Sequence, residues 1–175
     1  SAHCASQALY TLVQLGIPDI LGSNLCTLQE ISNAIGPTTN TDALLRTMRL
    51  LTTVGILNEH DVQDGGDDTL ASSLPNTGHA LRTDKNSNGS MAPCIQHWME
   101  RPLWMSWLEL PDYIRGEGYQ SLLPFDRANE GISSDFYYNA QDHPESLQRA
   151  NAFVRLVHER EMQAVVQGFD WASLG

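Results

Sequence analysis

The chain has 175 residues, of which 41% are hydrophobic, and it carries a formal net charge of -11 with an isoelectric point near 4.7. This hydrophobic content is enough for the core of one domain or of one and a half. The negative charge repels phosphate backbones and anionic membranes over most of the surface, so neither nucleic acid nor a membrane is expected as a partner. No apolar run approaches the roughly 18 to 20 residues that span a bilayer.

The cysteines Cys4, Cys26 and Cys94 are odd in number and far apart, with no C-x-x-C pair among them. This pattern predicts neither a disulfide framework nor a zinc site. We therefore expect reduced cysteines that mostly pack, in a cytoplasmic protein.

The first part of the chain alternates between helical patterns and stop signals. Apolar residues recur at helical spacing over 8–21, where Gly16 and Pro18 divide the run into a helix and a short turn. A capping-box spacing predicts a short helix over 27–36, and a second box, from Thr39 to Asp42, predicts a helix that ends near residue 55. The last two helices would form a helix-turn-helix pair.

A small hairpin is predicted next, with strands at 55–59 and 69–71 on either side of the acidic loop Asp61–Asp68. The loop lacks the residue order and the closing glutamate of a calcium-binding EF-hand, so we interpret it as a solvated turn and predict no metal site. The helix pair and the hairpin would together make residues 1–85 a winged-helix-like domain.

Winged helices often bind DNA, so DNA binding must be considered as an alternative function. The second helix of the pair carries only Arg46 and Arg49 as basic residues, and the hairpin is acidic. A DNA-reading helix needs several phosphate contacts, which this surface does not offer. A winged-helix transcriptional regulator, or a non-catalytic binding module, is therefore kept only as the alternative.

A polar stretch separates this domain from a second region, residues 90–175. The sequence predicts an aromatic-rich helix over 97–114, a loop over 116–131, a short helix or turn over 135–139 and a long helix from 142 to 168. The tryptophans and methionines of the first of these helices could line a pocket for an aromatic ligand. Stripes of this kind more often pack in a core, which is the interpretation favoured here.

No self-contained catalytic centre is recognisable. The sequence has no P-loop and no G-x-G-x-x-G, and His158 fails a zinc-protease motif because Met162 stands where a second histidine is needed. His97 and His158 could each act as a base or ligand, but a lone helical histidine is more often packed or exposed. No catalytic residue is predicted.

Seven short segments, taken in order, resemble one family. They are Ala8–Leu21, Thr47–Leu51 with Gly55–Leu57, Leu81–Asp84, Trp107–Leu110, Phe125–Ala128 and Phe169–Leu174. This order is similar to the N-terminal dimerisation domain and linking region of S-adenosylmethionine-dependent small-molecule O-methyltransferases, such as the plant caffeate and animal acetylserotonin enzymes. The resemblance implies a mainly α fold, with a winged-helix-like dimerisation domain and linking helices, truncated before an α/β Rossmann-like methyltransferase domain.

The resemblance also implies a homodimer formed through the N-terminal helices, and acceptor contacts in the second region. His97 and Trp98 fall where relatives carry substrate-wall residues. Ala150 and Val154 fall where relatives carry the Phe and Met that sandwich the acceptor ring. Both side chains are smaller here, which implies a bulkier or differently held acceptor than a flat phenylpropanoid.

The cofactor implied is S-adenosylmethionine, with Tyr137 and His158 near positions that touch it in relatives. The family's main cofactor-binding loop, D-x-G-x-G, and its catalytic histidine do not occur in this sequence. The chain begins at Ser1 without a methionine and ends just after its longest predicted helix. We therefore expect a fragment cut at both ends that does not catalyse methyl transfer alone.

Overall fold

The computed structural model describes residues 2–64, 67–84, 89–116, 122–139, 141–168 and 170. This part of the chain is mainly helical and contains one small sheet. The chain forms two compact units, Ser1–Met99 and Glu100–Gly175. None of the helices in the described ranges is long and apolar enough to cross a membrane.

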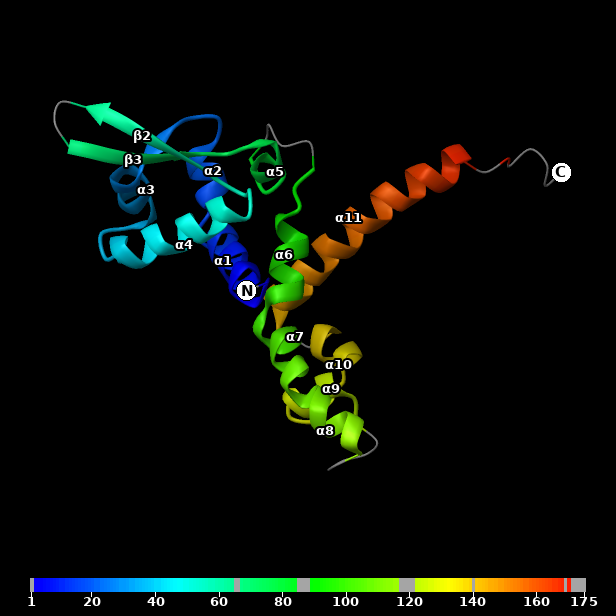
Figure 1. Ribbon diagram of the computed structural model, residues 1–175. Coiled ribbons are helices and arrows are strands. Elements are labelled where there is room, and N and C mark those ends of the chain that lie inside the picture. Colours follow the sequence, from blue (N-terminus) through cyan, green and yellow to red (C-terminus); the bar gives the residue numbers. More distant parts are fainter. Residues whose placement is uncertain are drawn as a thin grey trace. The chain divides into compact units, whose positions relative to one another are not determined.

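The elements of the first unit are shown from blue to green in Figure 1. In chain order they are α1 (Ala2–Gln14), α2 (Ile17–Leu21), β1 (Cys26–Thr27), α3 (Leu28–Ile35), α4 (Thr41–Thr53), β2 (Asn58–Asp64), β3 (Asp67–Ser73), α5 (Asn76–His79) and α6 (Ala92–Met99). Helix α1 packs against both α4 and α6. The first unit therefore extends past the predicted division between 1–85 and 90–175, and that domain assignment itself stays a prediction.

Helix α1 begins at Ala2, earlier than the predicted start at Ala8. Its first turn is exposed, so the apolar pattern that marks a buried face does not reveal it. The predicted break after α1 is confirmed: Gly16 adopts a left-handed conformation with φ 66°, and Pro18 stands in the first turn of α2. Glycine tolerates that conformation, and proline needs no N–H partner there.

The two predicted helix starts have different outcomes. For α3 the capping box is confirmed, because the Glu30 N–H donates to the Thr27 hydroxyl at 3.2 Å and the Thr27 N–H donates to the Glu30 carboxylate at 2.7 Å. For α4 the box at Thr39 is wrong. The N-cap is Asn40, whose side-chain oxygen accepts from the Ala43 N–H at 3.0 Å.

The sheet has the strand order β1-β3-β2, and both pairings are antiparallel. Strands β2 and β3 form a longer hairpin than predicted, with a register that runs from Asn58 opposite Ser73 to Asp64 opposite Asp67. The interpretation of Asp61–Asp68 as a loop is therefore wrong for its described part, and residues 65 and 66 lie outside the described residues. Strand pairing anchored near the core extends the ladder outward and overrides the low strand propensity of aspartate.

The hydrophobic core of the first unit is built from side chains of several helices. Its most deeply buried side chains come from α1, α2, α3, α4 and the turn before β2: Leu12, Ile17, Leu21, Ile31, Leu51 and Leu57. At the edge of this core the Asp19 carboxylate accepts hydrogen bonds from the Thr83 N–H at 2.7 Å and from the Asp84 N–H at 3.2 Å. Arg82 donates to Ser23 at 3.2 Å. Two of the family-like segments, distant in sequence, thus lie together.

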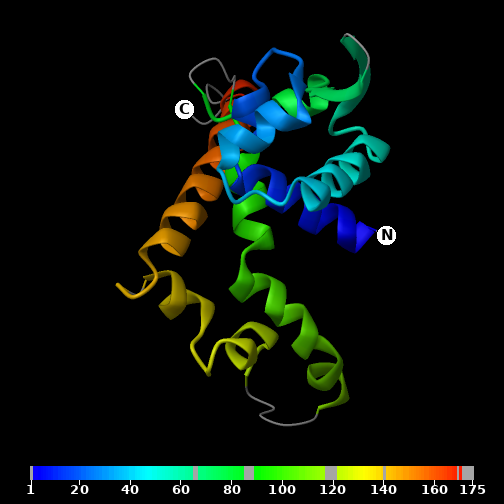
Figure 2. The same ribbon diagram turned by 90° about the vertical axis from the view of Figure 1, so that its left-hand side faces the viewer.

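The second unit contains α7 (Arg101–Ser106), the 3-10 helix η1 (Trp107–Glu109), α8 (Leu110–Arg115), α9 (Pro124–Ala128), α10 (Ser134–Asn139) and α11 (Pro144–Gly168). The chain runs through α7, η1 and α8 and returns through α9 and α10 (Figure 2), so that α9 packs against α7 and η1. The long helix predicted to end at Gly168 is confirmed as α11.

Two predictions for this unit are wrong. The helix expected over 97–114 is interrupted after Met99 and again at η1, and new helices start with Pro102 and Pro111 in their first turns. Proline favours such a position and disfavours a helix interior. The loop expected over 116–131 contains α9, which starts at Pro124.

Helix α9 is stabilised by a local cap at its start and by an ion pair with a more distant segment. The Asp126 carboxylate accepts from the Leu123 N–H at 3.3 Å. Arg127 pairs with Glu109 of η1 at 3.3 Å, and the Arg127 side chain is largely buried. Tertiary packing therefore fixes this short helix.

Candidate functional site

Helix α11 brings three of the predicted ligand residues onto one face. Ala150, Val154 and His158 are spaced by four residues, so their side chains project from the same side of the helix. Ala150 is half-buried, while Val154 and His158 are exposed. Together these three residues form a stripe, which is small and apolar at Ala150 and Val154 and carries an imidazole at His158.

Tyr137 is the fourth predicted ligand residue in the second unit. It lies on α10, which packs against α11. Its ring stacks on His143, with centroids 3.9 Å apart and planes inclined by 14°, and it meets Phe125 edge-on at 5.6 Å. Tyr137 and His143 also border a hollow of about 370 Å³, together with Arg101 and Met105 of α7. Tyr137 is thus held in place by aromatic contacts rather than left free to rotate.

A buried carboxylate joins three helices close to these residues. Glu100, directly before α7, is only 2% exposed. Its Oε1 accepts the Tyr138 hydroxyl at 2.8 Å, and its Oε2 accepts the Arg149 Nε at 2.9 Å. Arg149 also donates to Ser146 at 3.1 Å. Burial, then the hydrogen bond to the Glu100 carboxylate and its charge, raise the pKa of Tyr138 above its ordinary value, so this phenol is a donor and not a base.

Sequence reasoning missed this network. Tyr138 and Arg149 are 38 and 49 residues away from Glu100. No helical or strand spacing links such positions, and Glu100 sits in a segment that was predicted to be continuous helix. The only local signal is the proline two residues after Glu100, which favours a helix start at this point.

The remaining predicted residues, His97 and Trp98, lie on α6 in the first unit. The His97 side chain is buried, and its ring centroid is 5.5 Å from that of Trp98. Trp98 and Trp107 are 47% and 65% exposed, so the interpretation of the tryptophan cluster as core is wrong for these two residues. The breaks after Met99 and at η1 interrupt the helical period on which that interpretation depended. Within the described ranges, no three His, Cys, Asp or Glu side chains come close enough to bind one metal ion.

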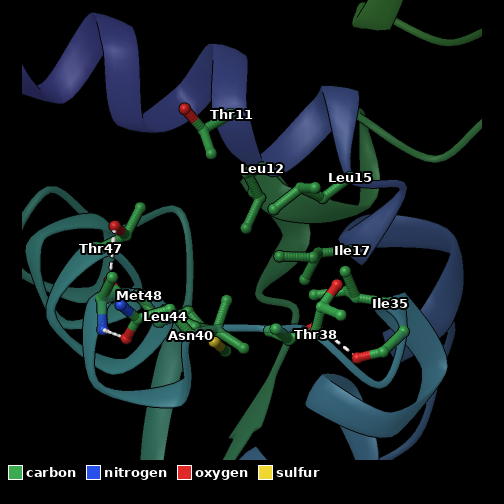
Figure 3. A pocket seen from close by; sticks show the side chains of 13 residues that line it. Thr11, Leu12, Leu15, Ile17, Ile35, Thr38, Asn40, Leu44, Thr47 and Met48 are labelled. Carbon is green, nitrogen blue, oxygen red and sulfur yellow. Dashed lines mark hydrogen bonds between the residues drawn. The ribbon is translucent and has the colours of Figure 1, made fainter.

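The first unit contains an apolar groove of about 320 Å³ between α1, the end of α3 and α4. Figure 3 shows Leu12 of α1, Leu15 of the turn that follows α1 and Ile35 of α3 pointing into it. Leu12 belongs to the core, whereas Leu15 at the groove wall is 40% exposed. The groove therefore continues the core of this unit to the surface.

Three threonine hydroxyls that border the groove are already used in hydrogen bonds within the chain. The Thr11 hydroxyl donates to Gln7 O and the Thr47 hydroxyl donates to Ala43 O, each at 2.8 Å. The Thr39 hydroxyl donates to Gly36 O at 2.7 Å. These hydroxyls are already bonded within the chain and most of the groove surface is apolar, so the groove suits an apolar occupant.

Comparisons with known proteins identify the first unit. Residues 1–73 match the family model of the O-methyltransferase dimerisation domain. No curated protein sequence matches the chain significantly. Among solved structures, the mitomycin 7-O-methyltransferase MmcR is 25% identical, with a TM-score of 0.72 over 97% of this chain and 45% of MmcR. The resemblance to S-adenosylmethionine-dependent O-methyltransferases is thus confirmed.

Two more distant structures share the fold. Human N-acetylserotonin methyltransferase in complex with SAM is 14% identical, with a TM-score of 0.73 over 94% of this chain and 45% of that one. CalO1, a methyltransferase of calicheamicin biosynthesis in its SAH-bound form, is 20% identical, with a TM-score of 0.72 over 97% of this chain and 45% of that one. The chain spans less than half the length of these structures.

Proposed function

We propose that this chain is the dimerisation and substrate-cap part of an S-adenosylmethionine-dependent O-methyltransferase, because residues 1–73 match the model of the O-methyltransferase dimerisation domain. The enzyme transfers the methyl group of the sulfonium cofactor to a hydroxyl of a small aromatic molecule, and the hydroxyl loses its proton. The family match is the observation that carries this proposal. The likeness to a mitomycin 7-O-methyltransferase along nearly the whole chain supports it.

In this function the chain supplies binding walls. Ala150 and Val154 on α11, together with His97 and Trp98, contact the acceptor, and Tyr137 and His158 contact the cofactor. A phenol with a pKa near 10 needs a base, and its oxygen must lie in line with the transferred methyl group. The sequence shows no glycine-rich cofactor loop, and neither His97 nor His158 stands in a recognisable catalytic motif. The chain therefore orients ligands and does not move the proton.

The first unit serves homodimerisation as a winged-helix-like domain. The groove between α1 and α4 lies entirely within the residues that match the dimerisation-domain model. Its lining presents hydrocarbon and methyl groups, and the core of a homodimer interface is apolar. In a two-fold dimer the same surface of each copy is used, which suits a groove with no charged side chain in its wall.

Methyl transfer is tested with the complete reading frame that encodes this chain, incubated with S-adenosylmethionine labelled in the methyl group and a panel of phenols of increasing size. We expect label on oxygen. The variant Ala150→Phe puts a bulky ring on the stripe of α11 and so narrows the space for the acceptor. It should raise the KM of the larger phenols more than that of the smallest. Ala152→Phe, two residues further on the same helix and off the stripe, is the matched control. Absence of labelled product from every phenol, or retention on double-stranded DNA, would refute the proposed function.

Dimerisation is tested by sedimentation velocity of the same protein. Leu15→Asp puts a charge into the apolar groove and should shift the population to monomers. Leu25→Asp, at a residue 49% exposed in the same unit but outside the groove, is the control and should remain dimeric. Equal effects of both substitutions would count against the groove as the dimer surface.

A further inference from the structure

Glu100, Tyr138 and Arg149 form a network, called the clamp below, that connects helices of the second unit. One carboxylate with both oxygens bonded holds a side chain of α10 and a side chain of α11 against the start of α7. Glu100 is 2% exposed and the Arg149 side chain 26% exposed. By comparison, the Arg46–Asp42 and Arg115–Asp112 pairs are more exposed, and the Arg127–Glu109 pair involves helices that carry none of the predicted ligand residues.

The positions of the clamped residues along their helices matter. Arg149 directly precedes Ala150, and successive residues of an α-helix differ by about 100° in direction. Holding the Arg149 guanidinium on Glu100 therefore restricts the rotation of α11 about its axis, and with it the direction of the stripe formed by Ala150, Val154 and His158. Tyr138 likewise directly follows Tyr137, whose ring packs on Phe125 and His143.

We propose that Glu100, Tyr138 and Arg149 are positioning residues, which orient the acceptor- and cofactor-contacting faces of α10 and α11 without touching either ligand. This inference rests on the proposed function of those faces. A buried ion pair adds little net stability compared with well-packed apolar side chains, whereas removing one partner leaves an uncompensated buried charge. Two roles, stability and orientation, can therefore be separated by removing one charge or both.

The experiment uses the complete protein and measures Tm, the KM of acceptor and cofactor, and kcat for a set of variants. Arg149→Met alone removes the ion-pair partner of the buried Glu100 carboxylate, so Tm should fall markedly. The double variant Glu100→Gln/Arg149→Met removes both charges and keeps an acceptor for the Tyr138 hydroxyl, so Tm should return towards that of the wild type. Its KM values should remain raised by about tenfold or more, since a displaced contact of about 1 Å far from the chemistry is enough for such losses.

Asp112→Asn is the matched control, because it removes the charge of an ion pair whose side chains are 48% and 60% exposed and should change neither Tm nor KM. Tyr138→Phe keeps the ion pair and should raise the KM of the cofactor with a small change in Tm. If the KM values return to normal together with Tm in the double variant, the network is only structural and the inference is wrong. If the double variant stays unstable, Tyr138→Phe decides: a raised KM supports the clamp, and an unchanged KM overturns it.

Hydrogen–deuterium exchange of the same variants tests the clamp without reference to activity. In the double variant, amides in the first turns of α11 should exchange faster than in the wild type, and those of the Asp112→Asn control should not. Unchanged exchange would overturn the clamp even in an active enzyme. If the wild-type protein transfers no methyl group but the double variant still exchanges faster than the wild type, the proposed function is refuted and the clamp stands.

Discussion

Gly78 lies in α5 at a point where a methyl group has no room. A Cβ added there would lie 2.5 Å from the carbonyl oxygen of Ile56 and 2.8 Å from a methyl group of Leu74. The short helix cannot move away easily, because the Thr77 hydroxyl donates to Gly55 O at 2.7 Å and ties α5 to the turn after α4. Gly78→Ala should therefore destabilise the first unit, although alanine is the better helix former.

The two opposing effects set the magnitude. Alanine in a helix interior gains about 0.5–1 kcal/mol over glycine, while an extra methyl group in a packed site costs about 1–3 kcal/mol. A clash with a backbone oxygen is relieved only by moving the backbone, so the cost belongs in the upper part of that range. The net loss should be about 1–2 kcal/mol of unfolding free energy.

Urea denaturation followed by far-ultraviolet circular dichroism measures this loss as a lower midpoint with an unchanged slope. Gly168→Ala at the end of α11 is the control, since no atom lies within 4 Å of the Cβ that it adds. The control should leave the midpoint equal or slightly higher. A Gly78→Ala protein as stable as the wild type would show that α5 does not approach the Ile56 carbonyl as closely as the structure has it.

Two further predictions concern the first unit. Thr27→Ala removes the N-cap of α3 and should cost about 1 kcal/mol at neutral pH, measured by urea denaturation. The Thr27 N–H and then its hydroxyl lower the pKa of Glu30 from its ordinary value of 4.5, so the contribution of the ionised Glu30 is complete above that pH and is lost as the pH falls through the lowered pKa. The difference between wild type and Thr27→Ala should shrink in acid, and a difference that grows there would contradict this. Burial raises the pKa of the Cys26 and Cys94 thiols, whereas Cys4 is exposed, so iodoacetamide near pH 8 should modify Cys4 first, as mass spectrometry of the peptides can show.

The helices that could be predicted are those whose ends are determined by residues close to them in the sequence. The capping box of Thr27 and Glu30 and the proline and glycine that bound α11 act over one turn of chain, so the sequence is sufficient to place them. The boundaries that could not be predicted depend on contacts between distant segments. Helix α9 is supported by the partly buried pair of Arg127 with Glu109, and the length of the hairpin follows from pairing that begins beside β1.

The candidate site divides in the same way. The stripe of Ala150, Val154 and His158 is a matter of helical period, and its common face follows from the spacing alone. The side chains that fix the direction of this face were not predictable, because Glu100 meets Tyr138 and Arg149 only in the folded unit. Residues that contact a ligand can thus be inferred from position, while residues that orient them require the structure.

The charge balance of the chain strengthens the case that Glu100 has a specific role. Acidic residues outnumber basic ones by 21 to 10, so many carboxylates have no basic partner and gain most from staying in water. Glu100 is nevertheless buried and takes the Nε of Arg149, although the exposed Glu145 lies 3.7 Å from the same guanidinium. A buried ion pair is weak evidence for stability, since apolar residues of similar volume often do as well or better. Its geometric specificity, two bonds to two helices from one carboxylate, is what an apolar replacement would lose, and this is the property that the double variant Glu100→Gln/Arg149→Met measures.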